Sequence, residues 1–216
     1  MIDGRHAVHP GRYLLVERSL AIPEIPALPP GFAAVPGGRD AWEAAVRGAG
    51  AGDDPGSVRW SFAEGTLCVA VVLAPDRPMR DSSPIVALGA LALFDALATL
   101  APPQVPIHLL PPDGLAVDGG RVATVRATMA SGPSDMPPEW AVLGFAVEVQ
   151  AGDAEPGRTP DRTSLHEEGF GDVTADDILV NSLRHLLAWL DAWGQDGITA
   201  LAPALRQRMA PHPVLA

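Results

Sequence analysis

The stretch from residue 107 to 127 constrains the fold most, because it reads as two apolar runs joined by an Asp-Gly turn. The run Ile107–Leu110 ends at Pro111-Pro112-Asp113-Gly114, a cluster that continues neither a strand nor a helix. A second apolar run turns at Asp118-Gly119, and an alternating run follows it. Asp-Gly between two apolar runs is the strongest short hairpin signal, since both central residues of a type I′ turn need a positive φ. These residues therefore predict a β-hairpin.

Composition and length predict a globular protein. The chain has 216 residues, of which 47% are hydrophobic and 19% are charged, a balance that disfavours disorder. A chain of this length fits one domain and hides about 70% of its unfolded surface. No uninterrupted apolar run reaches the roughly 18 residues that span a bilayer, and residues 1–6 lack the features of a signal peptide. We expect a cytoplasmic protein, with a lone Cys68 that excludes an internal disulfide.

The charged residues limit the partners that the chain can bind and the reactions that it can catalyse. The net charge is −11, which disfavours non-specific binding to nucleic acid and to anionic membranes. All fifteen basic residues are arginine. Without a lysine, no side-chain amine is available as a nucleophile or for a Schiff base. Genomic base composition is the simpler explanation of the preference for arginine over lysine. Whatever its origin, catalysis by a lysine amine is excluded.

The chain divides into a proline-rich arm, residues 1–27, and one domain, residues 28–216. Frequent prolines favour an extended path in the arm. In the domain, hydrophobic patterning predicts strands and helices. Besides the hairpin, strands are expected near 32–35, 58–62, 66–73 and 140–149, and helices near 41–47, 85–100, 175–193 and 197–209.

Helix ends carry local signals. Asp40 and Ser83 stand where N-caps are expected, with Pro84 as the first helical residue. Thr174 and Asp177 have the spacing of a capping box. We expect Gly194 to end the helix that begins there.

Three features allow either a functional or a structural interpretation, and we favour the structural interpretation for each. The glycine-rich segment 48–56 lacks the motif of a phosphate-binding loop and reads as a surface loop. Cys68 lies in an apolar run and reads as a small buried hydrophobe rather than a reactive thiolate. His166-Glu167-Glu168 has no second histidine at ligand spacing, so a solvated helix start is preferred to a metal site.

The central hairpin resembles that of the biotin/lipoate protein ligases, in which a Trp-Pro-Asn-Asp loop precedes a Val-Asp-Gly-Arg-Lys-Val-Gly-Gly-Ile hairpin. Here the loop is Leu110-Pro111-Pro112-Asp113, and residues 118–125, Asp-Gly-Gly-Arg-Val-Ala-Thr-Val, correspond to the hairpin. The essential lysine of that family falls on Arg121. The guanidinium keeps the positive charge, but its planar head differs in size and shape from an ammonium.

Shorter matches accompany the hairpin in the same order from about residue 28 to 206. Arg59-Trp60 corresponds to the end of the family's arginine-rich loop, without its repeated arginines. Gly144 corresponds to the first glycine of a Gly-Ile-Gly-Ile-Asn-Val strand, with Ala146 and Glu148 at the second glycine and the asparagine. Residues 163–169 resemble a Thr-Ser-Leu-x-Glu-x-Gly segment of biotin ligases. Gly144 either lets a ligand approach the backbone or relieves crowding against a helix.

The resemblance implies an α/β (α+β) fold of the class II synthetase and biotin-ligase type, a mixed and mainly antiparallel sheet packed with helices. It also implies ATP and biotin or lipoate as cofactors, and a carrier protein with an acyl-carrier, biotinyl or lipoyl domain. No metal site is evident in the sequence. Arg121 would hold the anion in place of the catalytic lysine. The other ligand-binding residues that it implies are Arg59, Trp60, Asp113, Gly119, Gly120, Ala123 and Gly144.

Two functions remain open. The first is a divergent ligase-like protein that binds a small carboxylic acid or its acyl-adenylate for transfer to a carrier lysine. The second is a catalytically inactive homologue, a pseudoenzyme that acts as an interaction or assembly subunit. A pocket between Trp60, Gly144 and Arg121 that stands open favours the first, and one filled by side chains such as Phe145 and Met129 favours the second. An octanoyltransferase with a cysteine intermediate fits poorly, and a homodimer stays open.

Overall fold

The computed structural model describes residues 26–82, 84–151 and 161–209. Most of the proline-rich arm, and Ser83 with its predicted capping role, lie outside these residues. The elements in chain order are β1 (Ala33–Ala34), α1 (Ala41–Gly50), β2 (Ser57–Ala63), β3 (Thr66–Leu73), the short 3₁₀ helix η1 (Met79–Asp81), α2 (Ile85–Leu100), β4 (Ile107–Leu110), β5 (Gly114–Val117), β6 (Gly120–Met129), β7 (Ala141–Glu148), α3 (Ala175–Asp196) and α4 (Ile198–Arg208).

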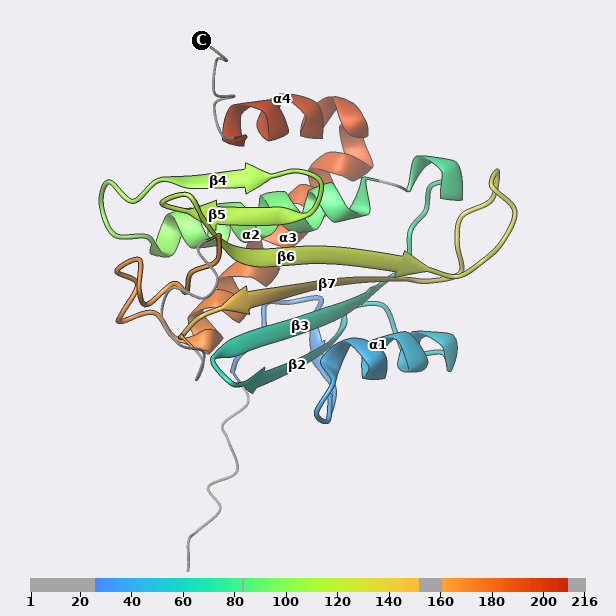
Figure 1. Cartoon of the computed structure of the whole chain (residues 1–216). Coiled ribbons are helices and arrows are strands. Elements are labelled where there is room, and N and C mark those ends of the chain that lie inside the picture. The colour runs from blue at the N-terminus through green and yellow to red at the C-terminus, as the bar shows by residue number, and fades with distance from the viewer. Residues whose placement is uncertain (1–25, 83, 152–160, 210–216) are drawn as a thin grey trace, which may run out of the picture.

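The described strands form one seven-stranded sheet in the order β1-β2-β3-β7-β6-β5-β4. Its pairs are antiparallel except β1 with β2, which is parallel. Helices α2 and α3 lie behind the sheet in Figure 1, and α1 lies in front of it. The predicted mixed, mainly antiparallel sheet packed with helices is confirmed.

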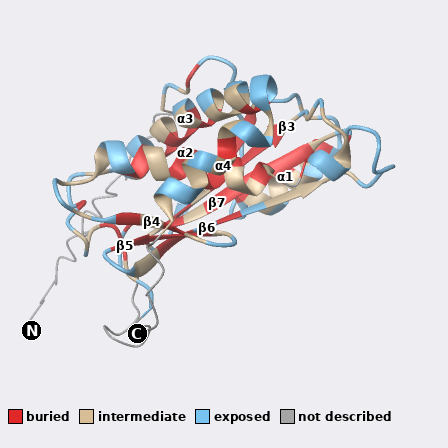
Figure 2. Ribbon diagram, turned by 90° about the horizontal axis from the view of Figure 1, so that it is seen from above, coloured by how far each residue is buried: buried red, intermediate tan, exposed pale blue. Residues whose placement is uncertain are grey.

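Successive residues of each strand face opposite sides of the sheet, which defines an inner face toward α2 and α3 and an outer face toward α1. In β3, Val69 and Val71 belong to the main core on the inner face. Their neighbours Ala70 and Val72 pack in a smaller cluster with Ala45 of α1. Figure 2 shows buried segments in the strands and in the helices that pack on the inner face. Because α1 is short, it covers only part of the outer face.

Helix α2 is the central core helix. Most of its residues are buried, including Leu88, Leu91 and Leu97, and burial of each such side chain contributes about 1.5–3 kcal/mol. The window Met79–Leu100 is long and apolar enough to cross a membrane by composition alone, but 53% of it is buried inside the fold. A buried core helix passes the same test, so the apolarity of α2 is accounted for by its packing.

The predicted hairpin is confirmed as β5 and β6, with Asp118 at φ 46° and Gly119 at φ 88° in the turn. The hairpin contains one irregularity that no sequence pattern predicts. Leu115 pairs with Ala123, whereas the next residue of β5, Ala116, pairs with Arg121. Val122 is therefore the extra residue of a β-bulge. In a regular strand Arg121 and Ala123 would face the same side, but the bulge puts Ala123 on the inner face and Arg121 on the outer face.

Helix α3 begins with the predicted capping box and ends later than predicted. Gly194 does not end it, because the helix continues to Asp196 and stops at Gly197, which has φ 61°. The Arg77 Nη2 donates hydrogen bonds to the carbonyl oxygens of Trp193 (2.9 Å) and Gly194 (2.8 Å). A side chain 116 residues away thus satisfies carbonyls of the last turn, which no local pattern reveals.

The capping box of α3 should contribute to stability in a pH-dependent way. The Thr174 hydroxyl accepts from the Asp177 N–H (3.1 Å) and donates to the Asp177 carboxylate, which lowers the pKa of that carboxyl from its ordinary value of 3.8. Thr174→Ala should lower the free energy of unfolding by about 1 kcal/mol at neutral pH. A lowered pKa stabilises the fold above the ordinary value, so part of this difference should vanish as pH falls through the pKa of folded Asp177. Urea unfolding at neutral and acidic pH measures it.

The neighbouring acid provides the control for this prediction. Asp176 also lies in the first turn of α3 but takes no part in the capping box. Asp176→Asn should cost only a few tenths of a kcal/mol through the helix dipole. An equal loss for Thr174→Ala and Asp176→Asn would contradict the assigned role of the box.

Candidate functional site

A row of small side chains crosses the outer face of the sheet over five strands. The pairings Ser61 with Cys68, Cys68 with Ala146, Ala146 with Thr124, and Thr124 with Gly114 place these residues side by side. We call this set the small-residue row. Only Gly114 among them is fully buried, and α1 does not cover the others. The row is a neutral strip of small side chains, and charged side chains stand on the same face to either side of it.

An aromatic–arginine pair borders the row on the side of α1. In the next line of paired residues, Gly144 stands beside Arg126. A Cβ atom at Gly144 would lie 2.7 Å from Cε3 of Trp42, the second residue of α1. The Arg126 guanidinium carbon lies 4.0 Å from the centre of the Trp42 ring, a cation–π contact. Of the two readings of Gly144, the structure supports crowding against a helix.

Arg59 lies in the same line but is covered. Only 7% of the residue is exposed, and its Nη2 lies 2.6 Å from Oδ2 of Asp53. Both groups pack against Gly48, near the end of α1. The segment 48–56 therefore folds over Arg59 and neutralises it with an internal carboxylate, so this guanidinium does not face the small-residue row.

Arg121 borders the other side of the row. Its Nη1 donates to Oδ1 of Asp113 at 3.4 Å, a long contact for an ion pair, and about a third of the Arg121 side chain (32%) is exposed. A Cβ atom at Gly114 would lie 2.2 Å from the Arg121 Nη1, so the guanidinium rests directly on this glycine. The Arg121 backbone is fixed by hydrogen bonds to Asp161 and Thr163.

Glu148 stands next to Arg121 on this border and is already paired. One of its oxygens accepts a hydrogen bond from Arg162 and the other accepts from the Thr66 hydroxyl at 2.8 Å. Its charge is therefore matched within the fold. Among the described residues, no group of three or more histidine, cysteine or acidic side chains is placed to hold a metal ion.

Cys68 is half-buried in the row rather than buried in the core, which corrects the sequence-based reading. Burial raises the pKa of the Cys68 thiol above its ordinary value of 9.0, the charge of Arg126 opposes this rise, and Asp40 and Glu148 add to it. The thiol is therefore neutral at physiological pH, and a reactive thiolate is disfavoured.

The match to known families decides what kind of protein this is. Residues 28–207 match the model of the biotin/lipoate A/B protein ligase family. The chain belongs to this family. The predicted resemblance is thereby confirmed over most of the chain.

Solved structures agree with the assignment of this ligase-family fold. A biotin protein ligase-like protein of unknown function from Silicibacter sp. TM1040 is 28% identical, with a TM-score of 0.78 over 86% of this chain and 81% of that one. The apo biotin protein ligase of Aquifex aeolicus is 15% identical, with a TM-score of 0.64 over 76% and 72%. The Leishmania major biotin protein ligase in complex with biotin is 13% identical, with a TM-score of 0.57 over 84% and 82%. The latter two show the fold alone. No curated protein matches the chain.

Some of the predicted site residues of this ligase-family chain come together, and others do not. Arg121 and Asp113 are in contact, and Gly144 lies on the same face. Trp60 pairs with Val69 and Ala123 pairs with Val147, so both point to the inner face, away from Arg121. Gly119 lies at the tip of the hairpin turn, and Gly120 packs against Thr163. Arg59 is covered, as described above.

The predicted pocket between Trp60, Gly144 and Arg121 is not formed, because these residues are divided between the two faces of the sheet. Phe145 and Met129 do not fill it either, since both pack on the inner face. Trp42 takes the place over Gly144 instead. Trp42, Ser61 and Thr124 were not predicted as site residues. Strand alternation alone indicates that Ser61 shares a face with Arg59.

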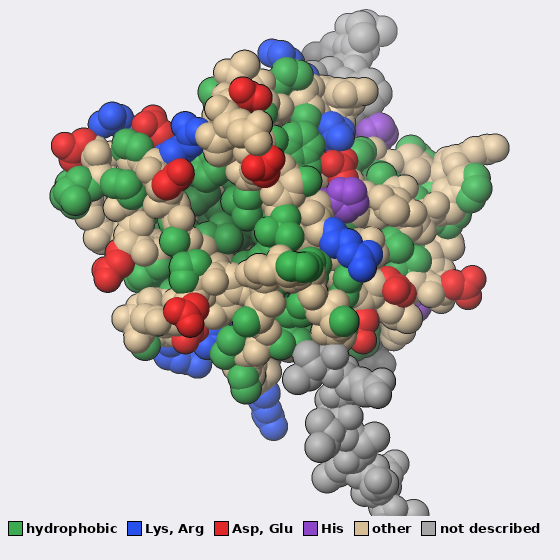
Figure 3. All heavy atoms as spheres, turned by 180° about the vertical axis from the view of Figure 1, so that it is seen from behind, with side chains coloured by type: hydrophobic (Ala, Val, Ile, Leu, Met, Phe, Trp, Pro, Cys, Tyr) green, Lys and Arg blue, Asp and Glu red, His purple; other side chains and the backbone are tan. Residues whose placement is uncertain are grey.

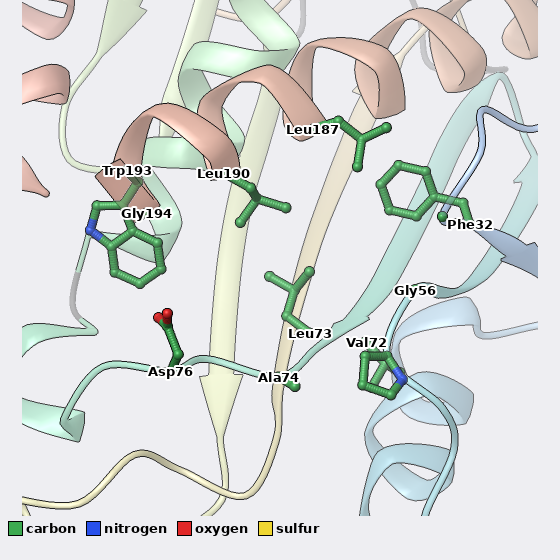
Figure 4. Close-up of a pocket in the computed structure, with 12 residues that line it drawn as sticks. Phe32, Gly56, Val72, Leu73, Ala74, Asp76, Leu187, Leu190, Trp193 and Gly194 are labelled. Atoms are coloured by element: carbon green, nitrogen blue, oxygen red, sulfur yellow. The ribbon is translucent and has the colours of Figure 1, made fainter. Parts of the chain in front are cut away.

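A separate pocket of about 340 Å³ lies at the end of β3 beside α3. It appears as a hollow with hydrophobic side chains in the view from the side of α2 and α3 (Figure 3), and Figure 4 shows its lining. The lining residues are Gly31, Phe32, Pro55, Gly56, Val72, Leu73, Ala74, Asp76, Leu187, Leu190, Trp193 and Gly194. It contains none of the predicted site residues.

Proposed function

We propose that this protein binds a small carboxylic acid, or the acyl-adenylate made from it, along the small-residue row, as a divergent ligase-like protein that transfers the acyl group to a carrier-protein lysine. The observation that carries the proposal is the position of Arg121. It replaces the family lysine, and the β-bulge turns it onto the outer face at the border of the row. A cation beside a neutral strip of small side chains suits a ligand with an anionic head and an apolar body.

The chemistry of the Arg121 contacts supports an anion there. Within residues 26–82, 84–151 and 161–209, one of the five guanidinium N–H donors is used, in the long contact to Asp113. The remaining donors match a carboxylate or phosphate in a bidentate arrangement. Asp113 is itself about half exposed (48%), so water can solvate it when the guanidinium turns to a ligand. The neutral Cys68 thiol adds no opposing charge.

Cofactors and partner follow from the same proposal. Solved biotin protein ligases hold biotin with ATP in A. aeolicus and biotinyl-5-AMP in L. major. We propose ATP and biotin or lipoate for this chain, with a biotinyl, lipoyl or acyl-carrier domain in the cytoplasm as acceptor. In this proposal Arg121 opposes the charge that develops at the α-phosphate, and loss of one such contact costs about 10²–10³ in rate.

A second function is favoured by a different observation. Arg59 is covered and paired with Asp53, so it adds no charge to the row beside Arg121 and Arg126. Activation of an acid by ATP needs dense positive charge around the triphosphate. A ligase-family subunit without catalysis, which binds protein partners, is therefore the alternative.

Thermal unfolding with ligands tests the first function. Biotin, lipoate and octanoate, each with and without ATP, and their non-hydrolysable acyl-adenylate analogues should be compared. A ligand at about 100 times its dissociation constant adds about 2.7 kcal/mol, which raises the midpoint by about 5–10 °C at this chain length. We expect one adenylate analogue to give this shift and Arg121→Ala to abolish most of it.

The control for Arg121→Ala is Arg184→Ala. Arg184 is an exposed arginine of α3, on the inner side of the sheet, so its loss removes the same charge away from the row. Equal shifts in both variants would show that Arg121 takes no part in binding the ligand. No shift with any ligand would refute the first function and leave the alternative.

A further inference from the structure

Two cations flank the small-residue row on one strand. Arg121 and Arg126 both belong to β6 and both face outward, with Thr124 of the row between them. Five positions separate them, one of which is the extra residue of the bulge, so their Cα atoms lie about 15 Å apart at ~3.3 Å per residue. Their flexible side chains bring the guanidinium groups over opposite borders of the same strip.

Arg126 is placed to take part in binding. It is exposed, and the Trp42 ring under its guanidinium fixes the group without using its hydrogen-bond donors. Burial raises the pKa of the Cys68 thiol in the row, and Arg126 lowers it against the opposite effect of Asp40 and Glu148. In the part of the chain that the structure describes, no carboxylate pairs with Arg126.

The carboxylates nearby have partners of their own within the fold. Glu148 is satisfied by Arg162 and Thr66. Asp113 holds Arg121 only by a long contact. Asp40 accepts the Glu43 N–H at 2.9 Å as the N-cap of α1, so its carboxylate is used at the helix end.

We propose that the acid bound at the row carries two anionic groups joined by an aliphatic spacer that crosses the row along β6, with one carboxylate on Arg121 and the other on Arg126. This inference rests on the proposed function and names its substrate class. Trp42 closes the end beyond Arg126, and the neutral row accepts the spacer. An unsubstituted monocarboxylate would leave one guanidinium without a partner, so the pair of arginines selects for the diacid.

Calorimetric titration of the full chain with matched acids tests the inference. Adipate, suberate and sebacate are compared with hexanoate, octanoate and decanoate at fixed ionic strength. At the best length we expect the diacid to bind about tenfold more tightly than its monoacid, as expected for one added charge-assisted hydrogen-bonded contact. In Arg126→Ala this preference should disappear, and in Arg184→Ala it should persist.

The outcomes separate the inference from the function on which it rests. Equal affinity of matched diacids and monoacids in the natural chain would overturn the inference and leave the proposed function standing. A preference that persists in Arg126→Ala would also overturn it. Binding of none of these acids or of the adenylate analogues would overturn both. Arg126→Lys, which keeps the charge, should retain part of the preference, and its melting curve shows that the variant folds.

Discussion

Gly56→Ala is expected to lower the free energy of unfolding by about 3 kcal/mol, or about 6–12 °C in the midpoint at this chain length. Gly56 has φ 87°, a left-handed conformation that costs other residues about 1–2 kcal/mol. A Cβ atom there would lie 2.1 Å from the carbonyl oxygen of Gly31. Relief of such overpacking typically costs about 1–3 kcal/mol.

The backbone around Gly56 cannot move aside easily. Its N–H donates to Val72 of β3 at 2.8 Å, and its carbonyl accepts from Ala33 of β1 at 2.9 Å. Gly56 is thus held between two strands, and the clashing atom of Gly31 is itself backbone.

Gly52→Ala is the matched control, because Gly52 has φ 95° but nothing within 4 Å of a Cβ atom. It should show the conformational cost alone, about 1–2 kcal/mol. Urea unfolding of both variants separates the two effects. If the two variants lose the same free energy, the close approach of Gly31 is not a constraint in solution.

Asp95→Ala is expected to lower the free energy of unfolding by about 2–3 kcal/mol. The Asp95 carboxylate accepts hydrogen bonds from Trp189 Nε1 of α3 at 2.9 Å and from Arg208 Nε of α4 at 3.0 Å. It therefore ties α2 to both C-terminal helices. Asp95 and Arg208 are only about one fifth exposed (19% and 22%), so removal of the carboxylate leaves a half-buried cation and an indole N–H without their partner.

A double-mutant cycle measures this network. Asp95→Ala, Arg208→Ala and the double variant should give a coupling energy of about 1–2 kcal/mol, because the residues share one contact. The control is Asp191→Ala, an exposed acid of α3 that accepts a hydrogen bond from Gln195, which should cost less than about 0.5 kcal/mol. Additive losses for Asp95 and Arg208 would contradict a direct interaction.

Local sequence signals predicted most of the helices and strands, because the residues that begin a helix or form a turn lie next to it in the chain. Asp40 begins α1, Thr174 and Asp177 begin α3, and the Asp118-Gly119 turn joins β5 and β6. The predicted end of α3 at Gly194 was wrong, because Arg77 donates hydrogen bonds to carbonyl groups of the last turn and the helix continues beyond Gly194. That contact joins segments far apart in the chain.

The site was predicted less well, since it depends on which face each side chain occupies. Arg59 and Trp60 were matched to one loop motif, yet neighbours in a strand point to opposite sides of the sheet. Ala123 was expected beside Arg121, and the bulge separates them. The helix that sends Trp42 over Gly144 was predicted, but no pattern indicates on which strand its tryptophan rests.

The extra residue in β6 makes the candidate site depend on strand length as well as on residue type. Deleting Val122 would remove the bulge, and regular alternation would keep Arg121 on the outer face as the direct neighbour of inward-facing Ala123. Relatives of this chain should therefore be compared by pairing partner rather than by position in an ungapped alignment. A relative without the bulge would carry the equivalent outward-facing cation two positions, rather than three, before the residue that corresponds to Thr124.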